Sequence, residues 1–459
     1  MHLRFLDREE ERLRLERLFA RREGALGVVY GRRRCGKSRL LREALPAEGV
    51  VHYVGDEREG SLQKASLARE IDRLIPGFAR VRYPDWDALL DRFWKEAPPR
   101  SVLVLDEFPA LVSAAEELAS LLQKRVDREI SRGIHVVLCG SSQRMMQGLV
   151  LDRTAPLFGR AVEILKVAPL PAGWIQQALH LRDPIEAIRA FAVWGGIPRY
   201  WELAADLPDL DTAVQRLALN PLGVLYEEPA RLLLDDTRDT VQVASILSLI
   251  GQGCHRLSEI AGRLGKPATS LSRPLQRLIE LDLIRRQVPF GVSPRSAKRT
   301  RYQIADPFLR FWFRFIEPNR SRLEAGRFAA VSSDLKRDFP HHVSGIWEEL
   351  ARDSVPRLEG FDQGFGPASR WWGAGVDQKP LELDIVAESD DAKSLLLGEV
   401  EWSEKSDAAR LVTELRRKAE NIPFRHGRKV QLALWTKRAA RGPRDVRILT
   451  PRHVLGVLR

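Results

Sequence analysis

The segment from Gly31 to Ser38 constrains this chain more than any other. It reads Gly-Arg-Arg-Arg-Cys-Gly-Lys-Ser, the GxxxxGKS pattern of a phosphate-binding loop, and the apolar run 26–30 leads directly into it. Such a loop follows a strand and precedes a helix, because backbone N–H groups and the positive helix end then surround the phosphates. Residues 39–44 are suited to that helix. The pattern therefore predicts a nucleotide site.

Individual residues of this loop have distinct expected roles. Lys37 is expected to reach the outer phosphates, and the hydroxyl of Ser38 is expected to bind Mg²⁺. The loop backbone contacts the phosphates itself, so we interpret the three arginines as solvent-facing or as contacts to a partner element. The residues predicted to hold the nucleotide are Gly31, Arg32, Arg33, Arg34, Cys35, Gly36, Lys37, Ser38 and Arg39.

A second motif supports the nucleotide site. Residues 101–105 form an apolar strand that ends in Asp106 and Glu107, the Walker B form. Asp106 is expected to hold Mg²⁺ through its water shell, and Glu107 to polarise the attacking water. The strand 134–139 is followed by Ser141 and Ser142. Either serine could contact the γ-phosphate or the water, with Ser141 as our catalytic candidate; a turn that caps the next helix is the alternative.

The chain is long enough for several domains. Its 459 residues correspond to roughly three domains, and a hydrophobic content of 44% is sufficient for buried cores. Residues 1–165 alternate short apolar strands with helical stretches, which predicts an α/β fold with a parallel sheet and helices on both faces. Residues 166–235 read as a small helical cap broken by prolines. A helical unit with a basic hairpin follows at 236–325, and a further α/β domain at 330–459.

Charge and cysteine content narrow the possible partners. The chain has 74 Lys and Arg against 62 Asp and Glu, a net charge of +12 that permits a polyanionic partner. The N-terminus has no apolar signal core and no apolar stretch approaches bilayer length, so we expect a cytoplasmic protein without a membrane partner. Its three widely spaced cysteines cannot form a disulfide framework or a metal knuckle.

Several segments resemble one known family. These are Phe5-Leu6-Asp7-Arg8-Glu9 before a charged helix, Tyr30-Gly31-Arg32-Arg33-Arg34 at the loop, and Gly195-Gly196-Ile197-Pro198 in the cap. They are similar to the archaeal-type ATPases, which are AAA+/STAND-related P-loop proteins. The resemblance implies ATP rather than GTP. It also implies that residues 5–8 lie near the adenine, which adds Asp7 and Arg8 to the nucleotide-binding set.

Residues 258–283 read as a helix-turn-helix with Gly265 in the turn. Pro274 falls near the first turn of the second helix if Ser270 is its N-cap. The segment 285–301 then carries six cations and no acid, which suits the wing of a winged helix that contacts phosphates. A solvated loop and a winged helix that binds protein are the alternatives. The candidate DNA contacts are Arg273, Arg277, Arg295, Lys298, Arg299 and Arg301.

The last part of the chain has the element order helix, three strands, helix, strand. Its expected elements are a helix at 341–354, strands at 370–372, 381–387 and 394–402, a helix at 406–421 and a strand at 429–436. This order resembles the core of PD-(D/E)XK nucleases. The resemblance implies a second divalent metal held by Asp384 and Glu399, with Glu348 or Glu349 on the preceding helix.

One position departs from the nuclease motif. The motif has Glu-x-Lys, and here Glu401 stands where lysine is expected. Lys405 or Lys418 could supply the charge from another direction. An active nuclease with a displaced lysine, an inactive nuclease-like domain, and acids at a sheet edge with only a structural role therefore all remain open.

Together these patterns indicate an ATP-binding, ATP-hydrolysing protein associated with DNA, in which a winged helix places a nuclease-like domain on DNA. The alternative is a STAND-type signalling or defence scaffold. In that case the nucleotide state would control homo-oligomerisation, and the C-terminal domain would dock a protein partner. A metal nuclease with a vestigial ATP site is disfavoured, because both nucleotide motifs are intact.

Overall fold

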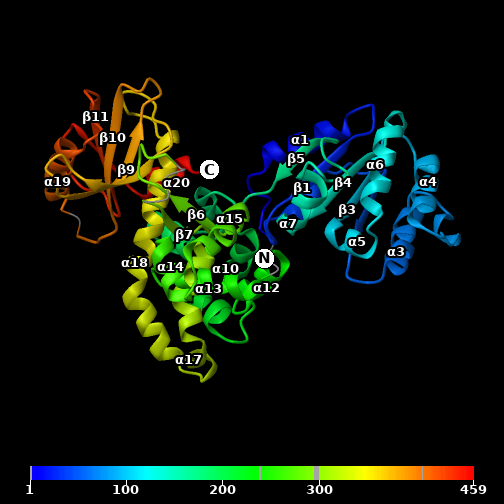
Figure 1. The fold of residues 1–459 in the computed structure, drawn as a ribbon, viewed down its shortest axis with the longest axis horizontal. Helices are drawn as coiled ribbons and strands as arrows, with labels where there is room; N and C mark the ends of the chain where they lie inside the picture. Colours follow the sequence, from blue (N-terminus) through cyan, green and yellow to red (C-terminus); the bar gives the residue numbers. More distant parts are fainter. Residues whose placement is uncertain (1–2, 237–238, 294–298, 406) are drawn as a thin grey trace. The chain divides into compact units, whose positions relative to one another are not determined.

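Two compact units make up the chain. The computed structural model describes residues 3–236, 239–293, 299–405 and 407–459 (Figure 1). One unit contains residues 5–169, and the other contains residues 170–233 and 239–459. Within the described residues, no helix has the length and the apolar content that crossing a membrane requires.

Five parallel strands form the sheet of the first unit, in the order β2-β3-β4-β1-β5. They are β1 (Leu26–Tyr30), β2 (Val50–Val54), β3 (Val102–Asp106), β4 (His135–Gly140) and β5 (Ala161–Lys166). Every residue of β3 and β4 is buried, which is typical of central strands covered on both faces. The predicted parallel sheet is confirmed.

Helices cover both faces of this sheet. On one face of the sheet, Leu103 and Leu105 of β3 pack into a hydrophobic core together with four helices. On the opposite face of the sheet, two further helices pack against each other. The four are α3 (Gly60–Asp72), α4 (Trp86–Glu96), α5 (Phe108–Ala114) and α6 (Leu118–Arg128); the pair is α1 (Glu9–Phe19) and α2 (Lys37–Ala44). The short helix α7 (Gln143–Met146) follows β4.

The second unit begins with short helices. These are α8 (Ile175–Ala178), α9 (Pro184–Trp194), α10 (Pro198–Ala205), α11 (Leu210–Val214) and α12 (Glu228–Asp236). Next come α13 (Thr240–Gly251), α14 (Leu257–Leu264) and α15 (Ser272–Glu280), followed by the antiparallel pair β6 (Ile284–Gln287) and β7 (Arg301–Ile304). Pro274 is the third residue of α15 and lies in its first turn, although the N-cap is Leu271 and not Ser270. The helices α16 (Pro307–Phe311) and α17 (Arg320–Glu324) lead onward.

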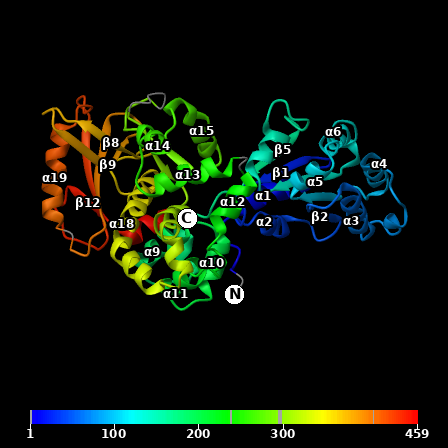
Figure 2. The same ribbon diagram turned by 60° about the horizontal axis from the view of Figure 1, so that its bottom comes forward.

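A mixed sheet forms the C-terminal part of this unit, in the order β12-β11-β10-β9-β8. Helices α18 and α19 lie on opposite sides of it (Figure 2). The elements are α18 (Phe328–Ser354), β8 (Ser369–Ala374), β9 (Pro380–Glu388), β10 (Ser394–Glu401), α19 (Ala408–Asn421), β11 (Lys429–Thr436), β12 (Val446–Leu449) and α20 (Pro451–Val457). The predicted order is confirmed, and β12 and α20 extend it.

The helix before this sheet is longer than predicted. We expected it to begin at residue 341, but it begins at Phe328 and runs through Pro340. Proline inside a helix removes one hydrogen bond and costs about 3 kcal/mol. Buried residues on both sides of Pro340, among them Val331 and Val343, offset this cost by packing.

Candidate functional site

The phosphate-binding loop connects β1 to α2. Gly31 has φ 150°, and a Cβ there would collide with the carbonyl oxygen of Val167. Gly36 has φ 93° and is the N-cap of α2. Both positions therefore require glycine. Lys37 lies across the loop, and its Nζ donates to the carbonyl oxygens of Gly31 at 2.9 Å and Arg32 at 3.2 Å.

The arginines of the loop do not share one environment. Arg33 is exposed, as predicted, but Arg32 is buried and Cys35 beside it is buried too. The expected solvent-facing position is therefore wrong for Arg32, whose carbonyl oxygen accepts from the Cys35 N–H; a contact of these arginines to a partner element stays a prediction. On α2, the guanidinium of Arg39 lies 5.9 Å from the ring of Phe5.

The carboxyl ends of β1 and β3 bring the two nucleotide motifs together. Ser38 Oγ donates to Asp106 Oδ2 at 3.0 Å, and the Glu107 N–H donates to Asp106 Oδ1 at 3.0 Å. Burial raises the pKa of Asp106, but contacts from His52, Cys139, Ser38 and Glu107 outweigh burial and lower it to about 2. Asp106 is therefore a carboxylate near neutral pH.

Glu107 and Ser141, the two catalytic candidates, contact each other. Oε2 of Glu107 accepts from Ser141 Oγ at 2.9 Å and from the Ser141 N–H at 3.2 Å. Glu107 has φ 51°, a left-handed conformation that is strained for a glutamate and frequent at functional sites. Ser142 instead accepts from the Met145 N–H and caps α7, which is the alternative expected for this turn.

The N-terminal segment lies beside the same loop. Asp7 and Arg8 both have left-handed φ values, 58° and 74°. The buried Arg8 donates to Glu11 Oε1 at 2.9 Å and to the carbonyl oxygen of Ala168. Gly31 lies against the carbonyl oxygen of Val167, the residue before Ala168. Arg8 is thus held near the phosphate-binding loop, and the place of residues 5–8 beside the adenine stays a prediction.

Carboxylates gather where β9 and β10 pair. Gly398 lies opposite Ile385, so the next position on each strand brings Glu399 opposite Asp384. Asp384 Oδ2 accepts from the Val400 N–H at 3.1 Å. Burial and the charge of Asp384 raise the pKa of Glu399, and the same two causes raise the pKa of Glu348 on α18.

Two cations from different elements face these acids. Lys418 on α19 has its Nζ 2.8 Å from Glu399 Oε2. Arg370 on β8 lies 3.4 Å from Glu348 Oε2 and 3.7 Å from Asp384 Oδ1. Sequence reasoning named Lys418 only as one of two options and missed Arg370. The feature that could have identified Arg370 is that an arginine lies within a half-buried strand.

The basic hairpin docks on the C-terminal sheet. The Phe290 N–H donates to the Arg370 carbonyl at 2.8 Å, and its ring packs against Phe424. Arg301 lies 3.3 Å from Glu382 Oε1 and stacks over Trp372, and Arg285 lies 3.9 Å from Glu349. The segment has no acid of its own, but the C-terminal domain supplies counter-charges.

The other candidate DNA contacts differ in exposure. Arg273 on α15 and Arg299 before β7 are exposed, whereas Arg277 is half-buried and pairs with Glu280 at 3.5 Å. Arg295 and Lys298 lie outside the described residues.

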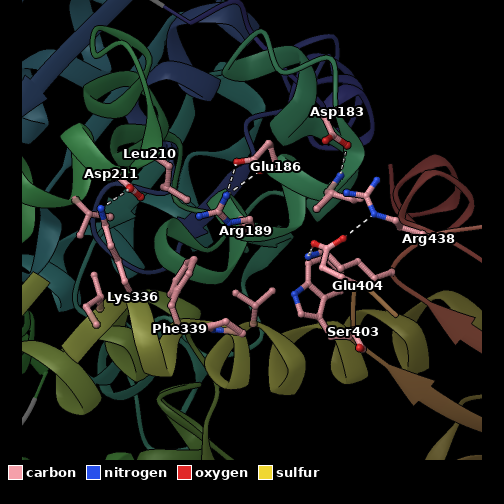
Figure 3. Close-up of a pocket in the computed structure, with 17 residues that line it drawn as sticks. Asp183, Glu186, Arg189, Leu210, Asp211, Lys336, Phe339, Ser403, Glu404 and Arg438 are labelled. Atoms are coloured by element: carbon pink, nitrogen blue, oxygen red, sulfur yellow. Dashed lines mark hydrogen bonds and ion pairs between the residues drawn. The ribbon is translucent and has the colours of Figure 1, made fainter. Parts of the chain in front are cut away.

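A cavity of about 640 Å³ also lies in the second unit, between α9, α11, α18 and the ends of β10 and β11 (Figure 3). Its cations have acidic partners: Arg189 pairs with Glu186, Lys336 with Asp211, and Lys437 and Arg438 with Glu404. The cavity therefore presents little net charge to an ionic ligand. No described residue that the sequence predicts to be functional lines it.

Comparisons with known proteins agree with the first site. Residues 5–202 match an ATPase domain found predominantly in Archaea, and residues 312–412 match archaeal and bacterial proteins of unknown function. An uncharacterized protein of Methanocaldococcus jannaschii is 29% identical over 427 residues, which cover 91% of this chain and 92% of that protein.

A solved structure supports the fold. The Walker-type ATPase of Pyrococcus abyssi is 20% identical, and the match covers 68% of this chain and 96% of that one with a TM-score of 0.52. The phosphate-binding loop, the Walker B strand and the matching domain agree. The N-terminal part of this chain is therefore a P-loop ATPase domain, and the protein is an ATPase.

Proposed function

We propose that this ATPase acts on DNA, and that its C-terminal domain is a metal-dependent nuclease whose essential lysine is Lys418. Residues 236–325 serve as a winged helix that places this domain on DNA. The observation that carries the proposal is the 2.8 Å separation of Lys418 Nζ from Glu399 Oε2. The ammonium of Lys418 supplies the positive charge that the motif lysine provides in nucleases, where this chain has Glu401.

In the ATPase site each contact has a role. Lys37 exchanges its bonds to the loop carbonyls for bonds to the outer phosphates of ATP. Ser38 Oγ and Asp106 Oδ2, which lie 3.0 Å apart, would hold Mg²⁺, which favours oxygen ligands. Glu107 accepts a proton from the attacking water, and Ser141 orients the Glu107 carboxylate.

The C-terminal acids fit a divalent cation. Oε1 of Glu399 is buried and has no hydrogen-bond partner among the described residues, although buried carboxylate oxygens ordinarily have one. No group of three or more His, Cys, Asp or Glu side chains within the described part of the chain is arranged for a metal. Two carboxylates are nevertheless sufficient for Mg²⁺, which keeps several waters.

Each of these residues then has a separate role in the hydrolysis of a phosphodiester. A bound divalent cation supplies an activated water and polarises the phosphoryl oxygen. Asp384 and Glu399 would hold that cation, and Lys418 donates a hydrogen bond to the attacking oxygen or to the phosphate. The water oxygen bonds to phosphorus and the water gives up one proton to solvent, the bond from phosphorus to one sugar oxygen breaks, and that oxygen takes one proton from solvent.

The DNA contacts favoured by exposure and charge are Arg273 on the predicted recognition helix α15 and Arg299 at the hairpin. Both are exposed and can reach phosphates or base edges. The docking of the hairpin on β8 connects the DNA-binding segment to the acidic centre within one unit.

The test is cleavage of supercoiled plasmid with Mg²⁺ or Mn²⁺, in the presence and absence of ATP. We expect wild type to nick the plasmid, and Asp384→Asn and Lys418→Gln to lose this activity. Lys405→Gln removes an exposed lysine from the same domain and is expected to cleave as wild type does. Lys37→Ala tests whether ATP controls cleavage.

The variants separate the alternatives. Full activity in Lys418→Gln together with its loss in Lys405→Gln would assign the motif lysine to Lys405. Absence of cleavage by wild type in every condition would overturn the nuclease. ATP-dependent changes in oligomer size in that case would favour the STAND-type scaffold.

A further inference from the structure

We infer that His52 binds the cation of the ATPase site directly through Nε2, and that this site consequently prefers ions such as Mn²⁺ and Co²⁺ to Mg²⁺. The inference rests on the proposed roles of Ser38 and Asp106 as holders of that cation. It makes Asp106 a direct ligand, instead of a residue that acts through the water shell, and adds nitrogen as a third protein ligand.

Strand pairing places His52 on the correct face of the sheet. His52 on β2 pairs with Val104 on β3, in parallel register. Alternate residues of a strand share a face, so His52 lies on the same face as Asp106, two positions beyond Val104. No sequence motif identifies His52 as a ligand, because Asp106, the residue that it faces, is on another strand.

The Nε2 atom lies 3.7 Å from Asp106 Oδ2, the same oxygen that accepts from Ser38 Oγ. This distance is too long for a hydrogen bond. Nε2 is nevertheless buried, and it has no hydrogen-bond partner among the described residues. A buried imidazole nitrogen that makes no hydrogen bond and lies 3.7 Å from a carboxylate oxygen can bind a cation together with that oxygen.

The separations suit one shared ion. Two ligand atoms that are each about 2.0–2.2 Å from a cation are themselves about 3–4 Å apart, depending on the angle between them. The distances from Asp106 Oδ2 to His52 Nε2 and to Ser38 Oγ, 3.7 and 3.0 Å, both fall within that range.

The chemistry of the ligand set determines the metal preference. Mg²⁺ favours oxygen ligands and retains its waters. Imidazole suits first-row transition metals, whose affinities rise from Mn²⁺ towards Cu²⁺. One nitrogen among oxygen ligands therefore strengthens binding of Mn²⁺ and Co²⁺ more than binding of Mg²⁺.

The direct test detects the nitrogen at the metal in the unaltered protein. The full-length protein is loaded with Mn²⁺ and a non-hydrolysable ATP analogue and is studied by pulsed electron paramagnetic resonance. We expect a nitrogen hyperfine coupling of directly bound imidazole, which changes to the ¹⁵N pattern when the chain contains ¹⁵N-labelled histidine. Absence of a histidine coupling at the bound Mn²⁺ would overturn the inference, and no variant has to fold for this result.

A metal titration supplies the second readout. Replacing His52 by Gln is expected to weaken Mn²⁺ binding in the nucleotide complex by on the order of tenfold or more, and Mg²⁺ binding by much less. His180→Gln changes an exposed histidine in the other unit and is the matched control. An equal loss for Mn²⁺ and Mg²⁺ in His52→Gln would contradict direct ligation.

If the proposed metal site of Ser38 and Asp106 is itself wrong, the metal titrations give a different result. Asp106→Asn is expected to lose nucleotide-dependent binding of both metals. If Asp106→Asn binds them as wild type does, the proposed metal site is itself misassigned. If Asp106→Asn loses both metals but His52→Gln loses neither, only the role of His52 is wrong.

Discussion

The hydroxyl of Ser141 donates a 2.9 Å hydrogen bond to Oε2 of Glu107, although 34 residues separate the two in the chain. The bond forms because β3 and β4 are neighbouring parallel strands that end at the same edge of the sheet. It fixes the position of the Glu107 carboxylate, the proposed base.

Changing Glu107 to Gln is expected to preserve ATP binding and to reduce hydrolysis by on the order of 10²–10⁴-fold, because the amide is not a base. Ser141→Ala should lower the turnover number by less and leave nucleotide affinity unchanged. Phosphate release and nucleotide titration measure the two effects. Normal turnover in Glu107→Gln would show that the base lies elsewhere.

Lys37→Ala is expected to abolish tight nucleotide binding. Hydrogen bonds to charged groups contribute about 1.5–3 kcal/mol, which corresponds to at least a tenfold loss of affinity. Arg22→Ala, an exposed position in the same unit outside the loop, is the control and should bind ATP as wild type does. Undiminished ATP affinity in Lys37→Ala, measured by calorimetry, would refute the assignment of the loop.

Arg299 and Arg301 are close in sequence but should differ in function. Arg299 is exposed, so Arg299→Ala is expected to weaken DNA binding at all sequences alike and to reduce the salt dependence by about one phosphate contact. Arg301 is engaged with Glu382 and Trp372, so Arg301→Ala should instead cost about 1 kcal/mol of stability. Fluorescence anisotropy at several salt concentrations and urea unfolding separate these effects. The reverse pattern would show that the hairpin meets DNA through Arg301.

His342 should make the protein sensitive to mild acid. It is fully buried on α18 with Nε2 2.8 Å from the Ala192 carbonyl, and burial lowers its pKa to about 3. The unfolded chain protonates this histidine near pH 6.5, so between pH 6.5 and 3 the unfolded state binds more protons. Stability is therefore full above pH 6.5 and falls as the pH falls, by about 2 kcal/mol between pH 7 and 5.

A matched variant isolates this contribution. His342→Gln retains an N–H donor for Ala192 but does not titrate. Urea unfolding at pH 7 and pH 5 should show a loss about 2 kcal/mol larger in wild type than in the variant. Equal losses in the two proteins would place the acid sensitivity elsewhere.

The ATPase site could be predicted because its parts are local or follow from one rule of topology. The loop from Gly31 to Ser38 is contiguous, and parallel strands put the ends of β1, β3 and β4 at one edge. The environment of Arg32 escaped prediction, because it depends on how the loop turns within the fold. His52 was missed for a similar reason, since the sequence does not reveal which strand lies beside β3.

The C-terminal centre was less predictable because its contacts join distant segments. Lys405 and Lys418 were equivalent options until the packing of α19 against β10 brought Lys418 to Glu399. Glu382, the carboxylate that pairs with Arg301, lies 81 residues further along the chain, on β9. The strand β12 has only four residues and includes Arg447, so no alternation of apolar residues marked it.

The helix α18 has a mechanical consequence. It is a single rod of 27 residues, about 40 Å long. Near its middle His342 is fastened to α9 of the cap, and towards its end it packs on β10 and carries Glu348. Because one helix contacts both the cap and the sheet, we expect a change in the orientation of the cap to be passed to the sheet that bears the acids.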